Sequence, residues 1–172
     1  DTTLWAAYID KYQNRTDGAG NIAEFLGNSS SVGSLGVDGA YSAMVLNKSI
    51  PGVTLTAQYG AMADKFDIYY LEAAYAGKAS NFTYGLAAQY SGTNYDAPTG
   101  TYQDTSYYGL KASLGMGAFN AYVAYSKVNA DGDAQDSIIA TDPIFTANEI
   151  SSNTYKATEK AYAIDANYQI NS

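Results

Sequence analysis

Hydrophobic and polar side chains alternate at every second position over five stretches of the chain. In the first stretch, residues 53–63, Val53, Leu55 and Ala57 share one parity, and threonine or glutamine stands between them. The same alternation runs through residues 82–91, 106–114, 119–126 and 162–170. Because successive side chains of a β-strand point to opposite faces, this period predicts strands with one apolar and one polar face.

Three further segments alternate less cleanly, and the first of them has an ambiguous parity. One assignment places Trp5, Ala7 and Ile9 on the apolar face and leaves Tyr8 and Asp10 opposite. With these segments the pattern predicts eight strands, at about residues 3–13, 37–48, 53–63, 67–76, 82–91, 105–114, 118–127 and 160–170. Strands of about ten residues have the length that a tilted strand needs to cross a bilayer.

The connections between the expected strands are of two kinds. Residues 49–52, 77–80 and 115–117 are short and rich in Gly, Pro and Ser, which is typical of tight turns. Residues 14–35, 92–104 and 129–158 are long and polar. In an up-and-down meander all tight turns lie at one end and all long loops at the other, as in outer-membrane barrels. We therefore predict one all-β domain over residues 1–172, an antiparallel up-and-down transmembrane β-barrel.

Aromatic residues bracket the aliphatic positions of several expected strands at intervals of six residues. The bracketing residues are Tyr69, Tyr75, Tyr84, Tyr90, Phe119, Tyr125, Tyr162 and Tyr168. Six residues span about 20 Å along a strand, close to the lipid-facing band of a barrel. Two aromatic girdles at the membrane interfaces would explain why the chain holds 18 Tyr but one Trp. A soluble sandwich with Tyr-rich strands is the alternative, although its buried face is rarely bordered by aromatics.

The composition excludes several classes of protein. The chain has no Cys and no His, which removes disulfides, thiolate nucleophiles, the Ser-His-Asp triad and most zinc sites. With a net charge of −8 and Arg15 as its single arginine, nucleic acid is an unsuitable partner. No apolar run reaches the ~18 residues of a transmembrane helix. We expect neither an enzyme nor a cofactor.

Charged residues on the polar parity are the candidates for a functional site. They are Asp10, Asp38, Lys48, Glu72, Lys111 and Asp165. Glu72 is the most informative, because a charge in mid-strand would cost a few kcal/mol on a lipid-facing position and must therefore face a water-filled lumen. Charges that line a pore set its ion selectivity, and the acidic excess favours a mild preference for cations. Ordinary ion pairs between neighbouring strands are the equally supported alternative.

The long loops hold two weaker signals. Asp131, Asp133 and Asp136 have a spacing that could offer oxygen ligands to calcium, but the Gly expected at the sixth position of an EF-hand loop is absent. A solvated acidic loop explains the same residues better, so we assign no metal. Residues 21–27 could form a short helix that folds back over the lumen or rests on the rim.

Several strand segments resemble a known family. They are Asp1 to Tyr8, the run that begins with Val37 to Tyr41 and ends with Pro51 to Ala57, Leu71 to Tyr75, and Tyr108 to Ala112. These stretches are similar to the OprD-like (Opr family) porins of the epsilon-proteobacteria and to the related Campylobacter major outer membrane protein. The resemblance implies an outer-membrane barrel of about eighteen strands, often trimeric, through which small hydrophilic solutes and ions diffuse. Better-known members carry a ladder of lumen arginines, and this chain has no arginine on an expected strand.

Eight strands would make only part of such a barrel. The chain shows no signal peptide, and its last residues lack the closing Phe of a typical final strand. We therefore expect an interior piece of a larger wall, surrounded by outer-membrane lipid. A closed eight-stranded barrel that serves as an anchor or adhesin through its long loops is the alternative. A secreted β-domain that binds a surface or glycan is a third.

Overall fold

The structure is a computed structural model that describes residues 1–9, 11–13, 22–24, 39–62, 65–96, 103–129, 131–135, 144–147 and 154–170. Every regular element in this part of the chain is a β-strand. No helix among the described residues is long and apolar enough to span a membrane.

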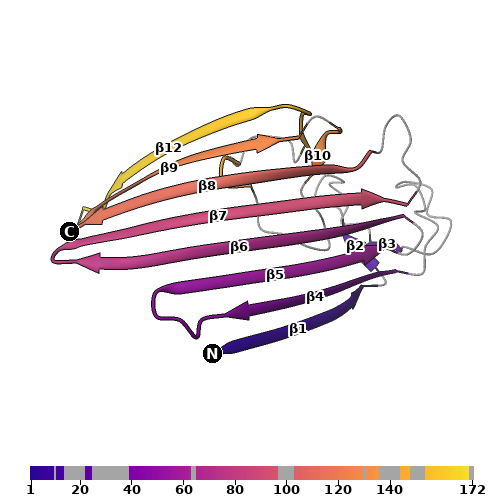
Figure 1. The fold of residues 1–172 in the computed structure, drawn as a ribbon, viewed down its shortest axis with the longest axis horizontal. Helices are drawn as coiled ribbons and strands as arrows, with labels where there is room; N and C mark the ends of the chain where they lie inside the picture. The colour runs from indigo at the N-terminus through magenta and orange to yellow at the C-terminus, as the bar shows by residue number, and fades with distance from the viewer. Residues whose placement is uncertain are drawn as a thin grey trace.

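Eight of the strands form one antiparallel sheet (Figure 1). They are β1 (Thr2–Ile9), β4 (Ala40–Asn47), β5 (Val53–Met62), β6 (Phe66–Ala79), β7 (Phe82–Tyr95), β8 (Thr105–Met116), β9 (Phe119–Val128) and β12 (Lys160–Tyr168). Their order across the sheet follows their order in the chain, so each strand pairs with its neighbours in sequence. The prediction of eight antiparallel up-and-down strands is confirmed.

The connections divide between the two ends of this sheet. Figure 1 shows the turns after β4, β6 and β8 at one end, together with both termini. Gly52 and Gly117 have positive φ angles of 75° and 58° in two of these turns, a backbone conformation that glycine adopts without strain. Two small hairpins, β2 (Lys11–Gln13) with β3 (Ile22–Glu24) and β10 (Ala134–Gln135) with β11 (Thr154–Tyr155), belong to the connections at the opposite end.

Some strand boundaries differ from the expected ones. The segment expected as one strand over residues 3–13 is divided, because β1 ends at Ile9 and pairs with β4, whereas β2 pairs with β3 in a separate sheet. The helix expected over residues 21–27 is wrong at residues 22–24, which form β3. β6 and β7 each have 14 residues, and the turn between them contracts to Ser80 and Asn81. Residues 77–79 continue the ladder opposite Phe82, Thr83 and Tyr84, because Gly77 and Ala79 fit the pleat as well as a turn.

The register divides the side chains of the sheet between two faces. On β6 the apolar face carries Tyr69, Leu71, Ala73 and Tyr75, and the side chains between them belong to the polar face. The pairing carries each face across all eight strands. Tyr8 pairs with Tyr41 on the apolar face, so of the two possible parities of β1 the one with Trp5, Ala7 and Ile9 on the apolar face is wrong. Its weak alternation permitted either parity, and only pairing with β4 decided between them.

The sheet is open in the described part of the chain. β1 and β12 lie at its two edges, and each pairs with a strand on one side only. The buried side chains gather on the polar face near the loop end, where Tyr107, Val128 and Ile144 form a small cluster. The sheet therefore has no second layer over its apolar face among the described residues, and large side chains such as Leu110 stay 51% exposed there.

Candidate functional site: the two faces of the sheet

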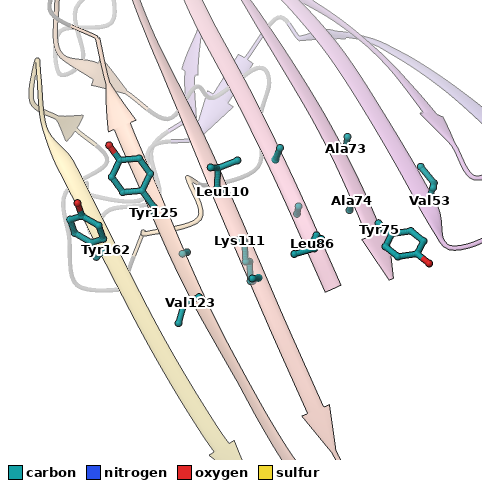
Figure 2. A pocket seen from close by; sticks show the side chains of 14 residues that line it. Val53, Ala73, Ala74, Tyr75, Leu86, Leu110, Lys111, Val123, Tyr125 and Tyr162 are labelled. Atoms are coloured by element: carbon teal, nitrogen blue, oxygen red, sulfur yellow. The ribbon is translucent and has the colours of Figure 1, made fainter. Parts of the chain in front are cut away.

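The centre of the apolar face is an uninterrupted aliphatic band. Its side chains include Leu71, Leu86, Leu110, Val123 and Ile164, all at least half exposed. Three alanines, Ala73, Ala88 and Ala112, leave a shallow hollow between these larger residues. Figure 2 shows this hollow between Tyr125 and Tyr162 on one side and Tyr75 and Val53 on the other. A surface that exposes so many apolar side chains together is typical of a contact with lipid or protein.

A row of tyrosines borders this band toward the loop end. Each of the eight strands contributes one residue to the tyrosine row: Tyr8, Tyr41, Tyr59, Tyr69, Tyr90, Tyr108, Tyr125 and Tyr162. Ring centroids lie 5.1 Å apart for Tyr8 and Tyr41 and 5.9 Å for Tyr69 and Tyr90. They lie 6.1 Å apart for Tyr108 and Tyr125 and 5.1 Å for Tyr125 and Tyr162. Such distances are favourable for aromatic pairs.

A second aromatic border lies toward the turn end and covers part of the sheet. The register places Tyr75, Tyr84, Phe119 and Tyr168 there on the apolar face, with Tyr75 and Tyr84 5.9 Å apart. On β1 and β4 the apolar face ends in polar side chains instead, and the Asn47 amide donates a hydrogen bond of 2.7 Å to Thr2 Oγ1. All eight aromatics singled out in the sequence thus lie on one face.

Four members of the tyrosine row were not among those eight. The sequence left the face of Tyr8 open, and Tyr41, Tyr59 and Tyr108 have no aromatic partner six residues away on their own strands. The signal that links them is the pairing between strands. Gly92 helps to place Tyr69 in the tyrosine row. A Cβ at residue 92 would overlap the ring of Tyr69, so the glycine makes room for it.

The polar face carries a chain of hydrogen bonds from β6 to β7. The Tyr70 hydroxyl donates to Glu72 Oε2 at 2.5 Å, and Gln89 Nε2 donates to the Tyr70 oxygen at 3.2 Å. Tyr70 and Gln89 are almost fully buried, with exposures of 0% and 3%. The carboxylate of Glu72 is therefore tied to a buried hydroxyl on its own strand, and no described residue forms an ion pair with it.

Lys111 meets aromatic rings on the same face. Its ammonium lies 4.2 Å from the centroid of the Tyr122 ring and 5.9 Å from that of Phe145. Cations are attracted to aromatic faces at such distances. Glu72, Lys111 and Phe145 line one hollow on this side of the sheet. The polar face thus brings the carboxylate of Glu72, the ammonium of Lys111 and the ring of Phe145 to one hollow, and the sequence did not indicate this grouping.

Residues 144–147, here called the inner segment, lie against the polar face. Ile144 is 2% exposed and packs on Tyr107 and Val128. The backbone N–H of Phe145 donates to Gln89 Oε1 at 2.6 Å. This part of the connection between β9 and β12 therefore returns over the sheet. A Phe in a long polar loop was the available sequence signal for it.

The other charged candidates are less closely grouped. Asp165 is exposed on the polar face of β12, where the Asn167 amide donates to it at 3.5 Å. Lys48 is exposed one residue beyond β4, in the tight turn. Asp10 and Asp38 lie outside the described residues. Lys78 joins the polar face because β6 continues to Ala79, and the sequence analysis missed it by ending the strand early.

The acidic residues of the last loop have other partners. Asp133 Oδ2 lies 2.7 Å from the Lys156 ammonium, and its Oδ1 accepts the Ala157 N–H at 2.8 Å. The Lys156 ammonium lowers the pKa of Asp133 below its ordinary value, and the backbone N–H adds to this shift. Asp131 accepts a hydrogen bond from the Asn129 amide, and Asp136 lies outside the described residues. The described residues hold no group of three metal-binding side chains.

Comparisons with known proteins identify the fold. No protein-family model matches the chain, and no curated protein matches its sequence. The structure is similar to OpdK of Pseudomonas aeruginosa crystallised with vanillate, at a TM-score of 0.79 and 16% identity, over 97% of this chain and 44% of OpdK. It is also similar to OccK8 (OprE) of Pseudomonas aeruginosa, at a TM-score of 0.78 and 14% identity, over 98% and 49%.

A third similar structure comes from another genus. OccAB4 of Acinetobacter baumannii matches at a TM-score of 0.73 and 15% identity, over 96% of this chain and 42% of that one. The chain therefore spans less than half the length of these solved structures. The eight-stranded sheet has the fold of a part of an OprD-type β-barrel.

Proposed function

We propose that this chain forms part of the wall of a bacterial outer-membrane porin, a water-filled channel for passive diffusion of ions and small hydrophilic solutes. The observation that carries the proposal is the contrast between the faces of one sheet. An aliphatic band bordered by the tyrosine row suits lipid, and the opposite face with Glu72, Lys111 and Asp165 suits water. A chain in this role has no need of catalysis or a cofactor.

The structural neighbours support this role. OpdK is an outer membrane protein of Pseudomonas aeruginosa, and one of its crystal structures holds vanillate. An identity of 16% carries the fold from OpdK to this chain but not its ligand. We therefore propose small hydrophilic solutes as a class for this chain, with outer-membrane lipid as the partner of its apolar face.

The edges of the sheet favour a larger barrel over a small closed one. In hydrocarbon every backbone N–H and C=O needs a partner, so open sheet edges do not occur there. β1 and β12 have partners on one side only. Further strands that pair with both edges would close the wall, as expected for a piece of an eighteen-stranded barrel. A closed eight-stranded anchor or adhesin would instead require β1 to pair with β12.

The charges of the polar face lead to a proposal about selectivity. The described part of this face carries two acidic residues, Glu72 and Asp165, and two basic residues, Lys78 and Lys111. The whole chain carries a net charge of −8. We propose a mild cation preference. In planar bilayers under a KCl gradient, Glu72→Gln should move the reversal potential toward anion preference by a few millivolts. Lys111→Gln should move it the other way, and equal permeability to both ions in the parent would contradict the preference.

The experiment that tests the channel itself is a conductance measurement. The full-length protein, purified in detergent and added to planar bilayers, should insert and produce stepwise ohmic currents. Insertion without current would contradict the porin role and favour an anchor. The resemblance to epsilon-proteobacterial porins further supports a trimer, which light scattering of the detergent-solubilised protein would detect as three copies per particle.

A further inference from the structure

The contacts of the inner segment with the polar face, among the described residues, include a backbone hydrogen bond and an apolar contact. The hydrogen bond joins the Phe145 N–H to Gln89 Oε1 at 2.6 Å, and Ile144 supplies the contact with Tyr107 and Val128. A turn closes the segment, because the Ala147 N–H donates to the Ile144 carbonyl at 2.7 Å. Gln89 is therefore the point at which a side chain of the sheet binds the backbone of the loop.

The side chain of Gln89 is itself fixed from two sides. Its Nε2 donates to Tyr70, whose hydroxyl donates to Glu72. With Nε2 engaged on β6, Oε1 points to the inner segment. A buried amide with partners at both ends has little freedom to rotate, because turning it would leave two polar groups without their bonds.

Gly109 provides the space for this side chain. Gly109 pairs with Gln89 in the register of β7 and β8. A Cβ at Gly109 would lie 2.6 Å from Gln89 Oε1 and 2.9 Å from its Cγ, distances that force the side chain to move. Because Gly109 on β8 has no side chain, the Gln89 side chain of β7 occupies the space beside it.

We propose that Gln89 is a positioning residue, which holds the inner segment over the lumen side of the sheet and thereby narrows the channel. The proposal rests on the proposed porin function for its consequence, but the positioning role itself is separate. The segment carries Phe145, whose ring centroid lies 5.9 Å from the Lys111 ammonium. Release of the segment would therefore widen the lumen and at the same time remove the Phe145 ring from Lys111.

A cysteine reporter measures the position of the segment directly. The chain has no native cysteine. The Thr146 hydroxyl oxygen is buried, so Thr146→Cys should react slowly with a maleimide while the segment stays in place. In this background Gln89→Met should raise the labelling rate about tenfold or more, because a buried hydrogen bond no longer opposes local opening. Equal rates in the parent and in Gln89→Met would overturn the proposal.

Two controls separate local release from general loss of structure. Gln169→Met makes the same substitution at an exposed position beyond β12 and should leave the rate at Thr146→Cys unchanged. A second reporter, Ser113→Cys, is exposed on the polar face of β8 and should react at the same rate with and without Gln89→Met. A parallel rise at both reporters would mean that the sheet itself is loosened and would contradict a positioning role.

Gly109→Ala keeps the proposal testable if Gln89→Met does not fold. This variant leaves the glutamine in place but displaces its amide, and it should raise labelling at Thr146→Cys by a smaller factor. Conductance then separates the two proposals. Faster labelling with larger channel steps supports both, whereas faster labelling in a protein that never conducts supports positioning and contradicts the porin role.

Discussion

The two faces of the sheet are built from the same strands but follow different rules. On the apolar face the side chains repeat from strand to strand, so that every strand adds a tyrosine to one row and aliphatic residues to one band. On the polar face single residues differ from their neighbours. Glu72, Gln89 and Lys111 each have a particular partner, and one of these partners belongs to a loop.

This difference reflects what each face is proposed to meet. Lipid is uniform along the wall, so the same side chains suit every strand at a given depth. A lumen acts through particular charges and constrictions, so its positions are specific. Substitutions on either face test this contrast, and their expected effects on folding free energy differ in size.

The largest effect should come from a charge in the aliphatic band. Leu110→Lys places an ammonium near the middle of the apolar face, where it should cost about 2–4 kcal/mol of folding free energy in a bilayer. Ser113→Lys on the other face of the same strand is the control and should cost much less. Urea unfolding in lipid vesicles would measure both. Similar costs would show that the apolar face does not meet lipid.

A smaller effect should follow from interrupting the tyrosine row. Tyr125 has ring neighbours on both sides, Tyr108 and Tyr162. Aromatic pairs contribute about 0.5–1.5 kcal/mol each, so Tyr125→Leu, which removes two pairs, should lower the unfolding free energy by about 1–3 kcal/mol. Tyr122→Leu removes a ring from the polar face, where it contacts Lys111. We expect Tyr122→Leu to alter the channel current more than the unfolding free energy. A larger effect on the unfolding free energy than on the current would contradict the contrast between the two faces.

A gain in stability is expected just beyond the tyrosine row. Lys127 and Lys160 pair directly on the apolar face at the loop end, where like charges oppose each other. Lys127→Glu should convert this repulsion into attraction and raise the unfolding free energy by about 0.2–1 kcal/mol at low salt. Lys127→Gln should gain less. The difference between the two variants should shrink in 1 M salt, and a difference that salt does not change would exclude an electrostatic cause.

The smallest effect concerns a loop beyond both faces. The Lys156 ammonium holds the pKa of Asp133 below the ordinary value of 3.8. A carboxylate with a lowered folded-state pKa stabilises above its unfolded pKa, and this contribution is lost as pH falls through the lowered value. The Ala157 amide NMR signal should therefore titrate with a midpoint below 3.8 and should not respond in Asp133→Asn. A midpoint at or above 3.8 would contradict the contact.

Much of the sheet could be predicted from alternation alone. Five stretches had a clean period of two, and the tight turns between several strands carried Gly, Pro or Ser. The parity of β1 could not be predicted, because Trp5 and Tyr8 are both aromatic and neither excludes the polar face. The length of β6 was underestimated for a related reason, since Gly77 and Ala79 fit a turn as well as a strand.

The candidate site divides in the same way. Glu72, Lys111 and Asp165 were identifiable as charges within alternating segments, and all three lie on the polar face, although only Glu72 and Lys111 line the same hollow with Phe145. Gln89 and the inner segment were not identifiable, because an uncharged amide in a strand has no pattern that links it to a residue 56 positions away. That link exists only once β7, β8 and the loop are packed.

The sequence by itself determined the secondary structure type, the division into two faces and the end at which the tight turns lie. These properties depend on local periodicity and turn chemistry, which neighbouring residues specify. The tertiary structure alone decided how Tyr8, Tyr41 and Tyr59 join one row, and which loop residue meets Gln89. Such contacts depend on the register between strands and on the return of a loop, and both are set by packing at long sequence separation.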